Sequence, residues 1–218
     1  MYKRQLLTLE AWRFSKLPQI LENGNGAKKD INKQFGFPEV FLFLVAVNFW
    51  NFFGAGVLGF IINLPIANYY EHGTYLTVNH GHAALMGVYG NLALAIVLFC
   101  CKLLVKPEWW KPRMIRTAFW SINIGLLLMV FLDLFPAGIW QFKTVTEYGL
   151  WYARSHTFIE STGFQTFTWL RMIGGALFTL GGVIPLTWFV ISRRRRLKKV
   201  NPKVGAEIQH QEEPVVSY

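Results

Sequence analysis

Four long apolar stretches constrain the fold of this chain more than any other feature of its sequence. Each is longer than the ~20 residues that an α-helix needs to cross the hydrocarbon core of a bilayer. A helix is the expected form because a segment in lipid must satisfy its backbone hydrogen bonds internally. The sequence therefore predicts four full transmembrane helices, over Pro38 to Leu64, Leu76 to Val105, Ile115 to Phe142 and Phe164 to Ile191.

The composition agrees with this class and argues against a soluble domain. Hydrophobic residues make up 53% of the 218 residues and charged residues only 16%, which is typical of an all-α, polytopic integral membrane protein. The net charge of +10 would suit a nucleic-acid partner if it lay on one surface. The basic residues cluster instead in short segments between the apolar stretches, so we expect a lipid bilayer as partner and no nucleic acid.

The distribution of these basic residues predicts the orientation. Most lie in 13–33, in 102–116 and in the tail from Arg193, whereas the connections on the other side contain only Lys143 and Arg154. Basic connections face the cytoplasm in membrane proteins. The amino end of the second stretch is therefore expected to lie in the outer leaflet.

Both ends of the chain extend beyond the four stretches. Ahead of them, "RQLLTLEAWRFSKLP" is typical of the last turns of another helix, which Pro18 ends. We therefore interpret 1–192 as a transmembrane domain with four full helices plus the end of a fifth. The segment 193–218 is basic and then polar, and we expect a cytoplasmic tail that is disordered beyond its first turn.

Two histidines, His80 and His82, lie near the outer end of the second stretch. On a helix that turns ~100° per residue, positions i and i+2 point ~200° apart, so the two side chains face opposite sides. They cannot bind one metal ion together, because a histidine pair of the soluble zinc type uses positions i and i+4. If both are ligands, each serves a separate cofactor. Haem suits this arrangement, because one imidazole holds the iron while the macrocycle lies against an apolar helix face.

Small residues around the pair leave room for flat cofactors, namely Gly81, Ala83, Ala84, Gly87 and Gly90. The same residues also suit close helix packing without any cofactor. The residues alone therefore leave three interpretations of the two histidines: cofactor ligands, hydrogen-bonded packing residues, or part of a transport pathway. The other histidines, His72, His156 and His210, fall in predicted loops or in the tail and are expected to be solvated.

Several stretches of the chain, and their order along it, resemble the large subunit of bacterial nitric oxide reductases, within the haem–copper oxidase superfamily. The stretch "LTVNHGHAALMGVYGNLALAIVLF" resembles the H-x-H helix of that subunit. The stretches "FPAGIWQFKTVTEYGLWYARS" and "QTFTWLRMIGGALFTLGGVIPL" resemble its last two helices, and "LTLEAWRF" resembles the exit of the helix after its non-haem iron site. The resemblance covers nearly the whole chain except the tail, and it is closer to the single-chain, quinol-dependent type. It implies a multi-pass protein of the bacterial cytoplasmic (inner) membrane.

The resemblance implies a role for each histidine of the pair. His80 corresponds to the proximal ligand of the high-spin haem b at the catalytic centre, and His82 to one axial ligand of the low-spin haem b. The implied activity is an oxidoreductase of the respiratory chain in denitrification, which reduces two nitric oxide molecules to nitrous oxide and water. Quinol or cytochrome c would supply the electrons.

The sequence also lacks residues that this family uses. Its non-haem iron is held by three histidines and a glutamate, including a paired His-His, and no such pair occurs here. The second axial histidine of the low-spin haem is absent as well. The resemblance therefore implies the carboxyl-terminal portion of a larger catalytic subunit, with the missing amino-terminal portion as its partner. We expect the isolated chain to be an inactive fragment that binds haem weakly.

Four further ionisable residues each allow more than one role. Arg154 lies where haem propionates would emerge and suits a carboxylate, but it could instead fix the outer loop to Glu147 or Glu160. Arg171 needs a partner inside the bilayer, either a propionate or an internal carboxylate. For Asp133 we favour a structural role, in which it caps backbone groups that Pro136 frees, over a proton relay. The role of Glu10 stays open.

Two other functions remain possible at this point. An oxygen-reducing relative with a copper site would share the H-x-H helix and would differ in the missing metal-binding segment. A non-enzymatic membrane subunit or a transporter component would hold no haem at all. The ligands of the second metal are the feature that separates these classes.

Overall fold

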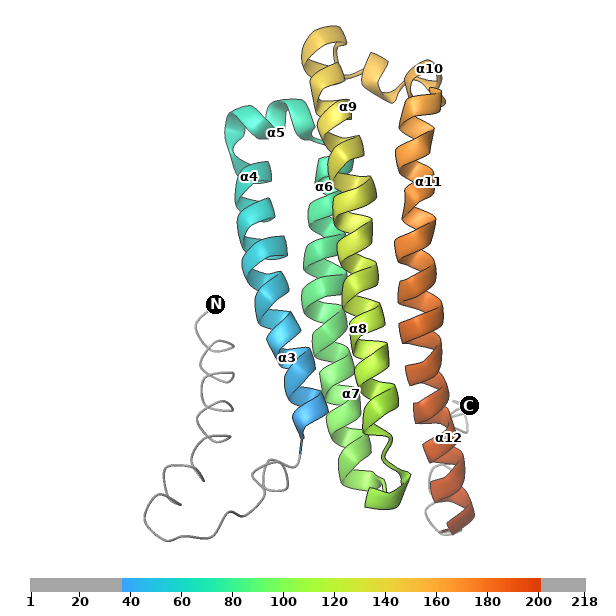
Figure 1. Cartoon of the computed structure of the whole chain (residues 1–218). Coiled ribbons are helices and arrows are strands. Elements are labelled where there is room, and N and C mark those ends of the chain that lie inside the picture. The colour runs from blue at the N-terminus through green and yellow to red at the C-terminus, as the bar shows by residue number, and fades with distance from the viewer. Residues whose placement is uncertain (1–36, 201–218) are drawn as a thin grey trace, which may run out of the picture.

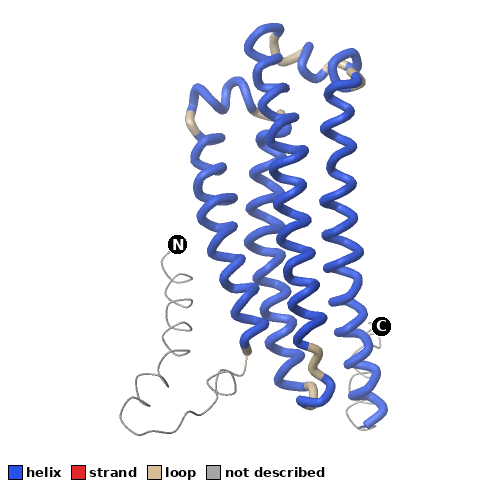
Figure 2. Tube along the Cα trace, in the orientation of Figure 1, coloured by secondary structure: helices blue, strands red, loops and turns tan. Residues whose placement is uncertain are grey.

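The computed structural model describes residues 37–200 of the chain, with side chains to residue 197. All regular elements in this part are helical and form four long columns (Figure 1, Figure 2). In the first two columns and their link, where η marks a π- or 3₁₀-helical segment, the elements are α3 (Pro38–Trp50), η1 (Asn51–Leu58), α4 (Gly59–Asn63), α5 (Pro65–Glu71), α6 (Tyr75–Gly81), η2 (His82–Gly90) and α7 (Asn91–Leu104).

The second half of the bundle repeats this arrangement with longer helices. Its elements are η3 (Pro107–Trp109), α8 (Pro112–Leu128), η4 (Met129–Leu134), α9 (Phe135–Tyr148), η5 (Tyr152–Arg154), α10 (His156–Ile159), α11 (Thr162–Ala176), η6 (Leu177–Val183) and α12 (Ile184–Val200). The short helices α5 and α10 lie at the same end of the columns (Figure 1), which we call the outer end after the orientation that the sequence predicts. Chain reversals at both ends thus place neighbouring columns antiparallel.

The four columns confirm the predicted spans. Continuous helices cover Pro38–Asn63, Tyr75–Leu104, Pro112–Tyr148 and Thr162–Leu197, and each is long and apolar enough to cross a membrane. Many large apolar side chains on them are exposed, including Phe52, Phe60 and Trp188. Such exposure is expected when the surrounding solvent is lipid. The third and fourth helices are longer than predicted at both ends.

A π-helical segment lies within each column, and one of them accommodates Pro136. The segment η4 leads directly into α9, and Pro136 stands in the first turn of α9. The helix is continuous at this point, so the proline removes one backbone hydrogen bond of the column, and the π segment just before it is where the column accommodates that loss. Pro136 therefore does not end the third helix, and the column runs on to Tyr148.

Close contacts hold the columns together. The first column packs on the second through η1 and η2, the second on the third through α6 and α9, and the third on the fourth through α8 and η6. A Cβ atom added at Gly125 would lie 2.7 Å from the carbonyl oxygen of Gly174. Glycines at this crossing therefore let two backbones approach closely, as small residues do in membrane bundles.

Hydrogen bonds between polar side chains connect the columns in the half of the bundle away from the outer end. Trp50 Nε1 donates to Asn123 Oδ1 at 2.9 Å, and Asn91 Nδ2 donates to the same oxygen at 3.2 Å. At the inner end, the buried carboxylate of Glu39 accepts from Trp110 Nε1 and Arg116 Nη2, each at 3.2 Å. These bonds connect three columns and fix their register.

The ends of the chain extend beyond this bundle. Helix α12 continues past Ser192 to Val200, further into the basic segment than the sequence predicts. The predicted end of a fifth helix, Glu10, the basic segment 13–33 and the tail from 201 lie outside the described residues.

Candidate haem-binding helix

The second column presents both histidines at the junction of two helical segments. Helix α6 begins after Thr74, whose side chain accepts from Leu76 N–H at the helix amino terminus and donates to the carbonyl of Glu71. This cap fixes the start of the helix. His80 is the penultimate residue of α6, and His82 is the first residue of the π segment η2. Single π turns inside α-helices are frequent at functional sites.

His80 faces the first column. Its Nδ1 lies 2.9 Å from the carbonyl oxygen of Gly54. A Cβ atom added at Gly59 would lie 2.9 Å from Cε1 of the same ring. Gly59 of the first column therefore leaves the space that the His80 imidazole fills, and the carbonyl of Gly54 supplies its hydrogen-bond acceptor.

His82 faces the third column. Its Nδ1 lies 3.0 Å from the carbonyl oxygen of Val78, one turn earlier in the same helix. On the same helix face, the ring of Tyr75 lies against the guanidinium of Arg171, which bonds to Asp133 of the third column. The two histidines thus lie toward different neighbours, as their spacing predicts.

The hydrogen bonds of both rings favour one tautomer. A carbonyl oxygen only accepts, so in each ring Nδ1 must carry the proton. A neutral imidazole protonated at Nδ1 presents the lone pair of Nε2. Metal-ligating histidines commonly donate their other N–H to a backbone carbonyl in this way, which fixes the ring. Each ring is therefore prepared to offer Nε2 to a metal ion, on its own side of the helix.

No second set of ligands accompanies the pair among the described residues. Within 37–200 no group of three or more His, Cys, Asp or Glu side chains is close enough to hold a metal ion. Both rings can therefore serve as single axial ligands, which is the way a protein holds a haem iron. The arrangement fits two haems better than it fits a protein-only metal cage.

An ion pair lies on the His82 side of the helix. Arg171 Nε donates to Asp133 Oδ2 at 2.5 Å, and the Asp133 side chain is fully buried. Arg171 also lies over the ring of Tyr75, with its central carbon 5.3 Å from the ring centroid. Of the two partners that the sequence left open for Arg171, the structure shows the internal carboxylate.

This pairing corrects the expected role of Asp133. We expected its carboxylate to cap backbone groups freed by Pro136, but it bonds to a side chain of the fourth column instead. The π segment η4, which lies immediately before α9, is where the column accommodates Pro136 without such a cap.

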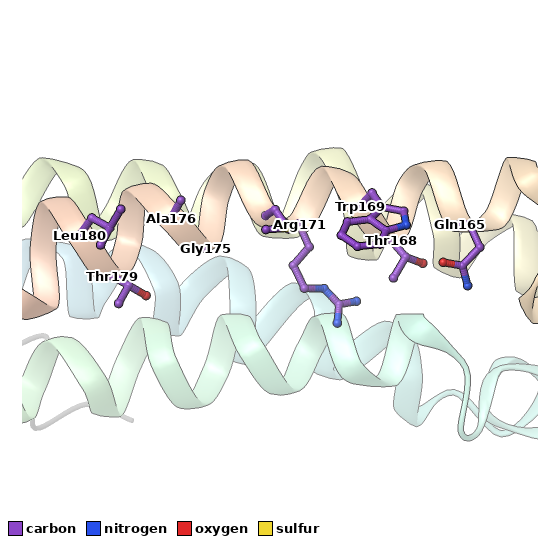
Figure 3. A pocket seen from close by; sticks show the side chains of 9 residues that line it. Gln165, Thr168, Trp169, Arg171, Gly175, Ala176, Thr179 and Leu180 are labelled. Carbon is purple, nitrogen blue, oxygen red and sulfur yellow. The ribbon is translucent and has the colours of Figure 1, made fainter.

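Arg171 borders a pocket of about 640 Å³ along α11 and η6. In Figure 3 the side chains of Arg171 and Gln165 extend to the same side of this helix. Trp169, Gly175 and Leu180 also line the pocket. The pocket is lined by one column only, and Gly175 has open space where a side chain would lie. A flat, largely apolar group could lie against this face.

Arg154 holds two outer segments together. Its Nη2 donates to the backbone carbonyl of His72 at 2.6 Å, and the side chain is exposed. The alternative partners predicted for it were wrong, because Glu147 pairs with Lys143 and Glu160 pairs with His156. The remaining N–H groups of the guanidinium are free to bind a carboxylate.

Glu71 and Asn79 are two buried polar residues that we did not single out from the sequence. Both are 1% exposed, and the Glu71 Oε1 atom and both amide atoms of Asn79 have no hydrogen-bond partner in the structure. Burial raises the pKa of the Glu71 carboxyl above its ordinary value, and the nearby His80 partly offsets this rise. Asn79 had a visible signal, because Tyr75, Asn79 and His82 follow an i, i+4, i+7 spacing that puts them on one helix face.

Comparison with known proteins gives two matches to this chain. A family model described as cytochrome c and quinol oxidase polypeptide I matches residues 24–177, which is more than half of the chain. A nitric oxide reductase subunit from Stutzerimonas stutzeri is 30% identical over 156 residues. That similarity covers 66% of this chain but only 30% of the relative, so the chain spans less than a third of that protein's length. The residues matched by the family model include both histidines and the Asp133–Arg171 pair.

Proposed function

Because the chain belongs to the cytochrome c and quinol oxidase polypeptide I family, we propose that it is the haem-holding portion of a membrane nitric oxide reductase. The reaction converts two nitric oxide molecules to nitrous oxide and water, and it consumes two electrons and two protons. One observation carries the proposal: each histidine of the pair donates Nδ1–H to a backbone carbonyl, which leaves Nε2 of His80 and His82 able to bind a metal on different sides of one helix.

His80 is the proposed proximal ligand of a high-spin haem b, and His82 an axial ligand of a low-spin haem b. When bound, both haems would supply iron that accepts electrons, and the high-spin haem would supply the iron that binds nitric oxide. The chain's own residues hold and orient them. The carbonyl of Gly54 fixes the His80 ring, and Gly59 leaves space for it.

Arg154 is the proposed propionate-binding residue. Its bond to the His72 carbonyl fixes the guanidinium at the outer end of the bundle, close to where the second column begins. Guanidinium groups pair with carboxylates through two parallel hydrogen bonds. One nitrogen holds the loop, and the others are available for the carboxylate.

The activity also requires a partner portion. The 218 residues include only five histidines and no His-His pair, so the proposed non-haem iron and the second axial ligand of the low-spin haem must come from residues outside this sequence. The Stutzerimonas relative is by its name one of several parts of an enzyme, which favours an assembly of this kind. Quinol is the proposed electron donor and cytochrome c the alternative.

The proposed orientation puts the basic end of the bundle in the cytoplasm of a bacterial inner membrane. Lys102 and Arg116 lie at that end, beside the buried carboxylate of Glu39. A topology reporter fused after Ser192 should show that the tail is cytoplasmic. The same reporter inserted at Gly73 should show that this loop lies on the outer side. The reverse pattern would place both histidines in the wrong leaflet.

The alternative function is oxygen reduction, because the family model that matches also describes oxidases. The test is to tag the chain, purify it from its native membranes with the portions that accompany it, and supply nitric oxide or oxygen separately. We expect consumption of two nitric oxide molecules per nitrous oxide formed, with reduced spectra of two b-type haems. Oxygen consumption without nitric oxide consumption would favour the oxidase. Absence of haem would leave a non-enzymatic membrane component.

A further inference from the structure

A charged cluster lies between the second, third and fourth columns, beside His82. It consists of Tyr75 and Asn79 on α6, Asp133 on η4 and Arg171 on α11. Asp133 and Arg171 form its ion pair, and the ring of Tyr75 lies against the guanidinium. Asn79 and Asp133 are almost completely buried, whereas the Arg171 side chain is 34% exposed toward the pocket along α11.

The cluster is poorly justified by stability alone. Asp133 Oδ1, Arg171 Nη2 and both amide atoms of Asn79 are buried without a hydrogen-bond partner. Each such group costs free energy, and even a well-bonded buried ion pair is often no better than apolar residues of the same volume. In the inner half of the bundle, the Trp50–Asn123–Asn91 network connects columns without any charge. The charges beside His82 therefore need another explanation.

The position of the cluster supplies one. Tyr75, Asn79 and His82 share one face of the second column, and the guanidinium that bonds to Asp133 lies over the Tyr75 ring of that face. The His80 ring bonds to the other side, toward Gly54. The ion pair is therefore placed to act on whatever His82 binds much more than on what His80 binds.

We propose that the Asp133–Arg171 pair sets the reduction potential of the haem iron that His82 holds. This inference rests on the proposed function. Reduction adds one electron to the iron and lowers its net charge by one, so a nearby positive charge favours the reduced form and a nearby negative charge the oxidised form. The pair, as a neutral unit beside the iron, keeps these two effects in balance. Both residues would act on the haem through their charges and not as ligands, so we class them as positioning residues.

The two members of the pair should act in opposite directions. Asp133→Asn leaves the guanidinium uncompensated and should raise the potential. Arg171→Gln leaves the carboxylate uncompensated and should lower it. A unit charge ~10 Å away, at an effective dielectric constant of ~20, changes the ratio of reduced to oxidised haem about tenfold at a fixed ambient potential. A purely structural role would shift both variants in the same direction.

The experiment is a spectroelectrochemical titration of the low-spin band in the complex purified from native membranes. It compares the wild type with Asp133→Asn, Arg171→Gln, the conservative Arg171→Lys and the double variant Asp133→Asn/Arg171→Gln. Arg171→Lys keeps the charge and should stay close to the wild type. The double variant removes both charges and should return toward the wild-type potential even if a single variant fails to assemble.

Lys143→Gln is a matched control, because it breaks an exposed ion pair with Glu147 at the outer end of the same column. It should leave the potential unchanged. Shifts of opposite sign in the two single variants, or a shift in one with recovery in the double variant, support the inference. Haem that binds normally with potentials that stay unchanged or move together overturns the inference alone. If the wild-type complex holds no haem, the proposed function and the inference both fail.

Discussion

The two sides of the histidine helix differ in how they hold a ring. On the His80 side, contact is close and mostly backbone: the ring bonds to the Gly54 carbonyl and lies against Gly59. On the His82 side, the ring bonds within its own helix, and the neighbouring column presents a buried carboxylate paired with an arginine. One side is defined by shape and the other by charge.

This difference matters for the proposed function, in which one helix serves two sites with different requirements. A position fixed by glycine contacts is sensitive to the addition of single methyl groups, because packed interiors do not relax fully. A position surrounded by charge is sensitive to changes that add no volume at all, because Coulomb interactions are strong where water is excluded. The predictions below separate these two kinds of sensitivity.

The largest effects should come from the histidines themselves. His82→Ala should remove the low-spin haem spectrum, and His80→Ala should disturb the high-spin spectrum and abolish turnover, because each loses its only ligand from this chain. Optical and electron paramagnetic resonance spectra of the purified complex would measure both. If neither substitution removed its signal, the two-sided arrangement would be wrong. Loss of both haems in one variant requires a check of folding by size-exclusion chromatography.

The next effect should distinguish shape from charge on the His80 side. In Gly59→Ala the new methyl group would lie 2.9 Å from His80 Cε1, so the ring must shift from its hydrogen bond. We expect a loss of ~1–3 kcal/mol in unfolding free energy and an altered high-spin spectrum. The low-spin spectrum should remain.

Gly175→Ala is the control for that substitution, because a Cβ atom there meets nothing within 4 Å. Alanine also has the higher helix propensity, so this variant should be as stable as the wild type or up to ~1 kcal/mol more stable. Equal stability of the two glycine variants would contradict the packing account of His80.

The smallest effect concerns two buried asparagines with different surroundings. Asn123→Leu breaks the network with Trp50 and Asn91 and should cost ~1–3 kcal/mol. Asn79→Leu removes two amide atoms that have no partner in the structure, so it should cost nothing or stabilise the haem-free protein by ~1 kcal/mol. Thermal unfolding in detergent would measure both. A larger loss in Asn79→Leu than in Asn123→Leu would mean that Asn79 has a partner.

The four spans could be predicted from the sequence because length and apolarity suffice to identify a transmembrane helix. Their ends could not, because helices such as the one ending at Tyr148 continue beyond the apolar stretch. The opposite directions of His80 and His82 followed from helix geometry. Their different surroundings did not, because Gly54 and Asp133 are distant in the chain and meet the helix only through packing.

The outer loop illustrates a signal that sequence reasoning could have used. A pair with Glu147 or Glu160 was one of two alternatives for Arg154, yet each of those acids lies four residues after a basic partner of its own. Pairs at i and i+4 meet on one helix face. Recognising them would have left Arg154 to find another acceptor, although not the specific carbonyl of His72. The Asp133–Arg171 pair, 38 residues apart on different columns, carried no comparable signal.

The most direct test of the two-sided helix is the number of haems per chain. Pyridine haemochrome assay and protein determination on the complex purified from native membranes give this ratio. We predict two b-type haems in the wild type, one in His80→Ala, one in His82→Ala and none in the double variant. One haem in the wild type, or two haems retained in either single variant, would contradict the claim that each histidine holds its own.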